Sequence, residues 1–460
     1  MFIKQFYTNC LSEAAYYIES NGKAAIIDPL RDVSPYIELA EERGATIQFV
    51  FETHFHADFV SGHIELARKT GADIVFGPGA ETDYAIIVAE DNAVFTLGDV
   101  QLKVLHTPGH TMESSCIMLM DEVGAEHALF TGDTLFIGDV GRPDLAVNAS
   151  LSREDLAGFL YDSIYEKILP LGDDLIIYPG HGKGSKCGKK LSEKKWSTLG
   201  AERISNYALQ DLSKPEFIQT VTEGLSTPPQ YFSKNAQLNK VGYMSLDQVL
   251  ENSYRPLSAQ DFAETLLQQN ALVLDCRTSS NWAASSVRGS LHVGMDGSFA
   301  VWVGSLVKDL NQPLLLITEP NMEREAIIRL ARVGYDNVLG FLKGGMDTWM
   351  KAGKKVDRVK CICPNAFLNL AYEEGQLLDV RRPDEFAAGA LESALNIPLE
   401  ELYERFPELD RQAPVFIYCK SGYRSAIAAS ILKQKGFDFV VNIKKGYQGL
   451  TQPSMACSCA

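Results

Sequence analysis

The segment His54-Phe55-His56-Ala57-Asp58-Phe59 decides the fold of the first half of this chain. It follows a short apolar run, residues 48–51, that predicts a β-strand, so its side chains leave a loop at the end of that strand. Side chains on such a loop can converge on a metal ion without the spacing that a helix imposes. Taken alone, the segment suggests a metal site.

Three further segments place metal-binding residue types at turns that follow strand-like runs. They are Thr107-Pro108-Gly109-His110, Phe130-Thr131-Gly132-Asp133 and Tyr178-Pro179-Gly180-His181. The chain has only 8 histidines, and four of them fall in this pattern. A metal site is therefore favoured over ordinary polar residues at loop ends.

This pattern resembles the metallo-β-lactamase superfamily over roughly the first 240 residues. In the dinuclear zinc hydrolases of that superfamily, including glyoxalase II, the first motif is His-x-His-x-Asp-His, and its last histidine binds the second metal ion. This chain has Phe59 at that position. A phenyl ring cannot bind a metal, so we expect a single ion.

Within the superfamily, the sequence resembles the persulfide dioxygenases related to the ETHE protein of mitochondria, which hold one Fe(II) on two histidines and one aspartate. The resemblance implies that His54, His110 and Asp133 bind the iron and leave positions open for a persulfide sulfur and O₂. Zinc lacks the redox chemistry that this oxidation requires. The residues expected to orient the ligands are His56, Asp58 and His181.

Two more residues are candidates for this site. Gly141-Arg142-Pro143-Asp144 resembles the Gly-Arg-x-Asp segment of the dioxygenases, which makes Arg142 a candidate to bind an anionic substrate tail or product. The alternative for Arg142 is a salt bridge with Asp139 or Asp144. Cys187 follows His181 among glycines and lysines and is a candidate accessory thiol of low pKa, although an ordinary loop cysteine is at least as compatible with its position.

The second half of the chain contains an internal repeat. Leu274-Asp275-Cys276-Arg277 matches Leu378-Asp379-Val380-Arg381, and His292 and Asn396 end similar stretches after the two aspartates. The same small β/α unit is therefore predicted twice. We place domains at residues 1–245, 246–357 and 358–452, followed by a tail at 453–460, with a polar linker at 231–242 and helical residues at 192–222.

The segment Cys419-Lys420-Ser421-Gly422-Tyr423-Arg424 joins a predicted strand, 415–418, to a predicted helix, 425–435. A thiol there faces backbone N–H groups and the positive end of the helix dipole, which favours the thiolate and makes Cys419 a nucleophile. The loop resembles that of rhodaneses, which implies sulfur transfer with Cys419 and Arg424 as catalytic residues. The alternative is a buried, inert cysteine.

The first repeat has Glu319 where the second has Cys419. A carboxylate cannot carry a persulfide, so we expect residues 246–357 to be a catalytically silent rhodanese domain.

The composition limits the partners. A net charge of −16 disfavours nucleic acid and anionic membranes as partners, and the longest apolar runs are too short to cross a bilayer. The 9 cysteines, spread along a chain without a secretory signal, are typical of reduced thiols in the cytoplasm.

The sequence thus predicts a multidomain α/β protein, a metallo-β-lactamase αββα sandwich followed by two rhodanese-like domains. The expected activity is Fe(II)- and O₂-dependent oxidation of a small thiol persulfide to sulfite, coupled to sulfur transfer through Cys419 that forms thiosulfate. Residues 192–245 leave surface for a homo-oligomer. Two alternatives stay open: a zinc-dependent thioester or lactam hydrolase of the glyoxalase II type with an attached sulfurtransferase, and a non-enzymatic sulfur carrier or sensor.

Overall fold

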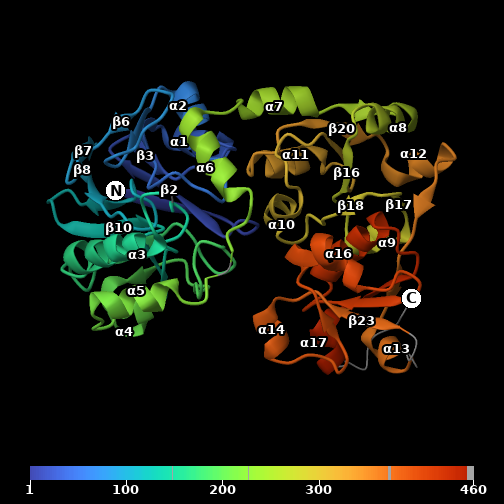
Figure 1. Cartoon of the computed structure of the whole chain (residues 1–460). Helices are drawn as coiled ribbons and strands as arrows, with labels where there is room; N and C mark the ends of the chain where they lie inside the picture. Colours follow the sequence, from blue (N-terminus) through green and yellow to red (C-terminus); the bar gives the residue numbers. More distant parts are fainter. Residues whose placement is uncertain (148, 226, 371–374, 453–460) are drawn as a thin grey trace. The chain divides into compact units, whose positions relative to one another are not determined.

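The computed structural model describes residues 1–147, 149–225, 227–370 and 375–452, whose helices and strands are drawn in Figure 1. They form two compact units. The first unit comprises Met1–Gln248 and Ala331–Gly334, and the second comprises Val249–Leu330 and the described residues from Tyr335 onward. The tail predicted at 453–460 lies outside the described residues, and the domain limits at residues 245 and 357 stay predictions.

The first unit contains two six-stranded sheets. One sheet has the strand order β1-β2-β3-β4-β5-β6, made of β1 (Phe2–Thr8), β2 (Glu13–Ser20), β3 (Lys23–Ile27), β4 (Thr46–Phe51), β5 (Asp73–Phe76) and β6 (Ile87–Val88). The other has the order β14-β13-β10-β9-β8-β7, made of β7 (Val94–Leu97), β8 (Val100–His106), β9 (Ser115–Met120), β10 (Glu126–Gly132), β13 (Ile176–Pro179) and β14 (Ser197–Thr198). A short hairpin, β11 (Leu135–Phe136) with β12 (Asp139–Val140), follows β10.

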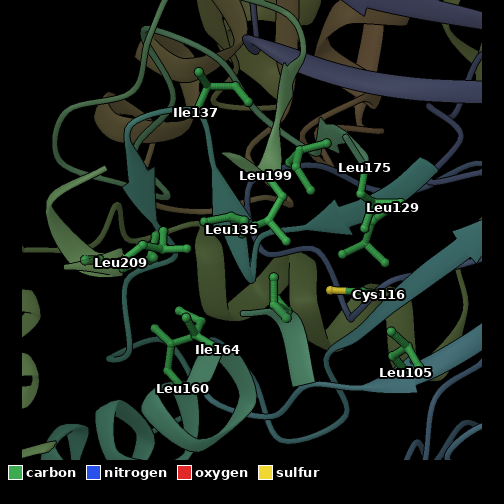
Figure 2. Close-up of a cluster of buried hydrophobic side chains, with 14 of the residues drawn as sticks. Leu105, Cys116, Leu129, Leu135, Ile137, Leu160, Ile164, Leu175, Leu199 and Leu209 are labelled. Carbon is green, nitrogen blue, oxygen red and sulfur yellow. The ribbon is translucent and has the colours of Figure 1, made fainter. Parts of the chain in front are cut away.

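Alternate side chains of a strand point to opposite faces of its sheet, and both faces are covered, which gives a four-layer sandwich. In β2, Tyr16 and Ile18 pack between the two sheets, whereas Ala15 and Tyr17 pack in the core that contains residues of α1 (Ser34–Arg43) and α2 (His63–Thr70). The outer face of the other sheet packs against α3 (Arg153–Asp162), the π-helix Ser163–Ile168 and α5 (Lys214–Thr222). Figure 2 shows Leu160 and Ile164 of this core together with Leu105, Cys116 and Leu129 of the sheet. The predicted αββα sandwich is confirmed.

Two predictions of local structure were wrong. Residues 192–222 are only partly helical, because Ser197–Thr198 forms the edge strand β14 before α4 (Leu199–Ser205) begins. The predicted linker at 231–242 is a helix, α6 (Phe232–Val241). Its apolar residues do not form a regular stripe, because two of its buried residues are Asn235 and Asn239.

The second unit contains two five-stranded parallel sheets that follow the same order. The first runs β15-β20-β19-β16-β18, made of β15 (Pro256–Leu257), β16 (Leu272–Asp275), β18 (Leu291–His292), β19 (Leu314–Ile317) and β20 (Val338–Leu342). The second runs β22-β26-β25-β23-β24, made of β22 (Lys360–Ile362), β23 (Gln376–Asp379), β24 (Leu395–Asn396), β25 (Val415–Tyr418) and β26 (Val440–Ile443). The helices that matter below are α9 (Ser279–Ala284), α14 (Pro383–Ala387), α15 (Leu402–Arg405) and α16 (Tyr423–Gln434).

Equivalent residues make equivalent bonds in the two repeats. Arg277 pairs with Asp275, and Arg381 pairs with Asp379, each with a shortest N–O distance of 2.6 Å. The side chains at the ends of β18 and β24 lie against the carbonyl oxygen of the same aspartate, at 3.1 Å in the first repeat and 3.0 Å in the second. The predicted repeat of one β/α unit is therefore confirmed.

The cysteines differ in part from the expectation of reduced thiols. Six described cysteines are free, namely Cys10, Cys116, Cys187, Cys276, Cys361 and Cys419. Cys363 is disulfide-bonded, which corrects that expectation for this residue. Among the helices of the described residues, none combines the length and apolar character needed to cross a membrane.

Candidate metal centre and sulfur-transfer loop

His54, His110 and Asp133 converge as the sequence predicted. They follow β4 of one sheet and β8 and β10 of the other, and all three are buried. One ligand atom of each lies within 4.8 Å of those of the other two. Oδ2 of Asp133 lies 3.4 Å from Nε2 of His110 and 3.9 Å from Nε2 of His54. These separations are of the size expected between ligands that share one ion at about 2.0–2.2 Å from each donor atom.

Hydrogen bonds leave the converging atoms available. Nδ1 of His54 lies 3.0 Å from the Thr53 hydroxyl, which donates to Asp28, and Nδ1 of His110 lies 2.9 Å from the carbonyl oxygen of Arg142. Each Nδ1 therefore carries the proton and each Nε2 keeps its lone pair. Oδ2 of Asp133 has no hydrogen-bond partner among the described residues. The site thus presents two imidazole nitrogens and one carboxylate oxygen that fit a divalent ion.

The charges of these groups also suit metal binding. Burial lowers the pKa of His54 well below its usual value and lowers the pKa of His110. Burial alone would raise the pKa of Asp133, but the neighbouring His181 outweighs it and holds that pKa well below its usual range. Neutral imidazole and ionised carboxylate are the forms that bind metals.

Phe59 is a buried aromatic residue of the loop that carries His54 and His56. Its ring is fully buried and stacks on His56, with centroids 4.3 Å apart and an interplanar angle of 28°. Nε2 of His56 lies 3.0 Å from Asp28 and 3.4 Å from Glu52. His56 therefore forms a separate cluster with these two carboxylates beside the three candidate ligands.

Asp58, His181 and Cys187 form a third buried group. His181 lies between two carboxylates, with Nδ1 2.7 Å from Asp133 and Nε2 2.8 Å from Asp58. It thus contacts the candidate ligand Asp133 through Oδ1, whereas Oδ2 is the oxygen nearest His54 and His110, and its role in orienting this ligand stays a prediction. Cys187 lies in this group, but burial raises the pKa of its thiol well above the usual value, contrary to the low pKa expected for an accessory thiol.

Arg142 is buried and already paired. Its guanidinium bonds both carboxylate oxygens of Asp144, at 2.6 and 2.8 Å, and the carbonyl of Lys186 at 3.1 Å. This is the salt bridge that the sequence offered as the alternative. A role of Arg142 in anion binding stays a prediction, while its backbone carbonyl orients His110.

Asn239 of α6 is a site residue that the sequence did not indicate. Its amide nitrogen donates to the carbonyl oxygens of His56 and Phe59, at 2.8 and 2.9 Å, and its oxygen accepts the N–H of Ser61 at 3.0 Å. One side chain therefore fixes three backbone groups of the ligand-bearing loop. No motif marks it, because a single asparagine in a polar stretch carries no periodic signal.

Cys419 lies between β25 and α16 as predicted. It is buried, and the Gly422 N–H donates to its sulfur at 3.1 Å. Gly422 has φ of 108°, a left-handed conformation that favours glycine. Sγ also lies 3.6 Å from the hydroxyl of Ser425 in the first turn of α16.

Arg424 points to a carboxylate that sequence reasoning missed. Its guanidinium bonds both oxygens of Glu385 on α14, at 2.6 and 2.8 Å. Burial alone would raise the pKa of Glu385, but this pairing lowers it to about 2. The guanidinium of Arg424, at the end of the Cys419 loop, is therefore held in an ion pair with Glu385.

The first repeat holds a carboxylate where the second has its thiol. Glu319 accepts the backbone N–H of Thr278 at 3.0 Å and the amide of Asn281 at 2.7 Å. The side chain thus fastens its own loop to α9. The lack of sulfur chemistry in the first repeat stays a prediction.

The chain matches two known families. Residues 8–181 match the metallo-beta-lactamase superfamily, and residues 258–352 and 364–452 each match the rhodanese-like domain. A cytoplasmic hydroxyacylglutathione hydrolase of Arabidopsis thaliana is 32% identical over 184 residues, which are 39% of this chain and 67% of that protein. The chain spans 65% of the length of one such hydrolase from Schizosaccharomyces pombe and 50% of one from Brucella ovis.

Two solved structures are similar. A metallo-beta-lactamase from Staphylococcus aureus is 34% identical with a TM-score of 0.67, and the match covers 74% of this chain and 99% of that one. ETHE1 from Myxococcus xanthus is 27% identical with a TM-score of 0.45, over 52% of this chain and 98% of that one. The likeness to the Staphylococcus aureus protein extends beyond the N-terminal unit, because it covers 74% of the chain.

Proposed function

Because the chain belongs to the metallo-beta-lactamase superfamily and carries two rhodanese-like domains, we propose that it oxidises persulfide sulfur at the first site and transfers sulfur at the second. The substrate of the first site is a small thiol persulfide, and its products are sulfite and the free thiol. Sulfite and sulfane sulfur then combine to thiosulfate at Cys419. A cytoplasmic location and an Fe(II) cofactor are parts of the same proposal.

One observation carries the first half: the two Nε2 atoms and Oδ2 of Asp133 converge with their lone pairs free, while Phe59 takes the place of a further ligand. Two histidines and one carboxylate on one side of an ion leave its other positions open for a sulfur ligand and O₂. Fe(II) bound there would supply the electron transfer to O₂ that zinc cannot supply.

The protein's own residues supply geometry and exclusion of water. Thr53 and the carbonyl of Arg142 hold the two imidazoles in the tautomer that binds a metal, and His181 holds Asp133. The ligands are buried, so the reacting sulfur would leave bulk solvent. The overall reaction balances as R–S–SH + O₂ + H₂O giving R–SH, sulfite and two protons.

The second half depends on Cys419. The N–H of Gly422 and the start of α16 stabilise negative charge on its sulfur. A persulfide on Cys419 would pass its outer sulfur to sulfite: the S–S bond breaks, a new S–S bond forms thiosulfate, and the thiolate of Cys419 leaves. The ion pair of Arg424 with Glu385 fixes the guanidinium beside this loop.

A zinc-dependent hydrolase of the glyoxalase II type is the second candidate. The names of the curated relatives favour it, since they are hydroxyacylglutathione hydrolases. The buried group of Asp58, His181 and Cys187 also favours it, because it offers ligand types for a second zinc ion.

Purified protein separates these candidates. We expect about one iron per chain, O₂ uptake with glutathione persulfide, and no hydrolysis of a hydroxyacylglutathione. Two zinc ions per chain with thioester hydrolysis and no O₂ uptake would establish the hydrolase instead. Turnover of neither substrate would favour the third alternative, a non-enzymatic sulfur carrier or sensor.

The Cys419→Ser variant tests the sulfur-transfer half. It should keep O₂ uptake and release sulfite instead of thiosulfate. Unchanged thiosulfate output from this variant would show that Cys419 is not the carrier.

A further inference from the structure

The helix that carries the Cys419 loop is buried on two sides. In α16, every residue from 425 to 432 is buried, although a helix on the surface of a single β/α domain keeps one face in water. One side of α16 packs on β25 and β26 of its own domain, and another packs on β18 and α9 of the silent repeat. The silent repeat therefore completes the surroundings of the active helix.

Hydrogen bonds from the silent repeat run along this helix. At its first residue, the Tyr423 hydroxyl donates to the carbonyl oxygen of Gly294 at 2.7 Å. In its middle, Ser430 accepts the N–H of His292 at 3.0 Å. At its last residue, Gln434 donates to the carbonyl of Gly289 at 3.0 Å.

The contact at Tyr423 is a close fit as well as a hydrogen bond. A Cβ atom added to Gly297 of the silent repeat would lie 2.5 Å from two atoms of the Tyr423 ring. Glycine is required there by the neighbouring ring, because any side chain would push Tyr423 aside. The silent repeat thus fixes both the ring and the hydroxyl of one residue in the active loop.

Tyr423 directly follows Gly422, whose N–H donates to the sulfur of Cys419 at 3.1 Å. Displacing Tyr423 would therefore shift the adjoining Gly422, whose N–H stabilises charge on this sulfur. We propose that the first rhodanese domain, which lacks the loop cysteine, positions the sulfur-transfer loop of the second. Tyr423 is the positioning residue, and it is held by its contacts with Gly294 and Gly297. This inference rests on the proposed sulfur transfer at Cys419.

This role explains how a domain with Glu319 in place of the loop cysteine contributes to the chemistry. Glu319 fastens the loop of the silent repeat to α9, and α9 packs against α16. The silent repeat is thus a fixed surface against which the active loop is set. It fixes the position of the Cys419 loop, so a change in the first repeat should alter the reactivity of Cys419.

The Tyr423→Phe variant of the full chain tests the proposal. We expect thiosulfate formation to lose about fivefold in kcat with a smaller change in KM, as expected for the loss of one hydrogen bond. Alkylation of Cys419 by iodoacetamide at fixed pH, followed on its peptide by mass spectrometry, should slow by a similar factor. The matched control is Tyr403→Phe, which removes a 2.8 Å hydroxyl bond to Gln434 at the opposite end of α16.

Equal alkylation rates in the wild type, Tyr423→Phe and Tyr403→Phe would overturn the positioning role. Equal slowing in both variants would also overturn it, because the effect would then be general loosening of the helix. Alkylation needs no sulfur acceptor, so a wild type that forms no thiosulfate defeats the proposed function while the alkylation comparison still tests this inference.

A second variant changes only the first repeat and leaves the residues of the second unaltered. Gly297→Ala should slow alkylation of Cys419, whereas Gly172→Ala, at a glycine with open space around its Cβ position, should not. The melting temperature of each variant shows that the chain is folded. A folded Gly297→Ala protein with wild-type alkylation would overturn the proposal.

Discussion

Nδ1 of His181 lies 2.7 Å from Oδ1 of Asp133, so the carboxylate that faces the candidate metal position is held from behind by an imidazole. The other imidazole nitrogen bonds Asp58 at 2.8 Å, which fixes the ring at both ends. Asp133 is thereby aimed at His54 and His110 before any ion binds.

Removing this support should weaken metal binding without removing a ligand. We expect His181→Ala to lower the affinity for Fe(II) by about 10- to 100-fold, since residues that orient metal ligands commonly contribute this much. Competition with a chelator measures the change. His127→Ala is the control, because His127 belongs to none of the three candidate metal groups. Equal affinities in both variants would contradict this role of His181.

Restoring a ligand at Phe59 should change the number of bound ions. Phe59→His recreates the His-x-His-x-Asp-His motif, and an imidazole is smaller than the buried phenyl ring that it replaces. We expect the metal content of protein purified with added zinc to rise from about one toward two ions per chain. Phe55→His places the same residue outside the motif and should leave the content unchanged. A wild type that already holds two ions would remove the basis of this prediction.

Asn239 should stabilise the ligand-bearing loop. Asn239→Ala leaves two buried carbonyl groups and one N–H without this partner, and we expect a loss of about 2 kcal/mol in the free energy of unfolding of the first unit. Denaturant unfolding followed by circular dichroism measures it. The control is Asn235→Ala on the same helix, because the buried amide of Asn235 has no hydrogen-bond partner among the described residues. A cost at position 235 equal to that at 239 would contradict the prediction.

His292 should make the silent repeat sensitive to acid. Burial lowers the pKa of His292 to about 4, against 6.5 in the unfolded chain, and its ring stacks on Trp282 at 4.8 Å. The unfolded chain therefore takes up the proton first as the pH falls, so stability that is present above about pH 6.5 is lost toward about pH 4.

Between about pH 7 and about pH 5 the expected loss is roughly 2 kcal/mol. His292→Asn, which introduces the residue of the second repeat at this position, should remove this dependence. Melting temperatures of both proteins at the two pH values measure it. Parallel pH profiles of the wild type and the variant would show that His292 is not responsible.

The sequence predicted the parts of the site that chemistry restricts. Residue types at strand ends predicted a metal site, and the resemblance to the persulfide dioxygenases then singled out His54, His110 and Asp133 as its ligands. The loop of Cys419 was predicted from its place between a strand and a helix. Asn239 could not be predicted, because it acts through an amide on backbone groups about 180 positions away in the chain. Glu385 was missed for a similar reason, since its role depends on the placement of α14 beside Arg424.

Parts of the fold were likewise predictable from the sequence, and other parts were not. The sequence predicted the strands, because burial makes apolar residues recur in a regular pattern. It also predicted the repeat, because Asp275 and Asp379 lie in matching segments. The helix α6 was not predicted, because two of its three buried residues, Asn235 and Asn239, are polar and leave no apolar period. Cys363 shows another limit, since the position of a thiol in the sequence does not specify its oxidation state.

The strand order and the Asp–Arg ion pair that the two repeats share have a practical consequence for protein engineering. Both sheets follow one strand order, and in both an Asp–Arg ion pair lies at the end of the strand beside the central one, β16 or β23, although only the second repeat has a cysteine in the loop after the central strand. The first repeat is therefore a ready recipient for a transplanted loop: residues 419–424 grafted in place of 319–324 would meet the same scaffold, and a chain with two working thiols could be built without redesigning either core.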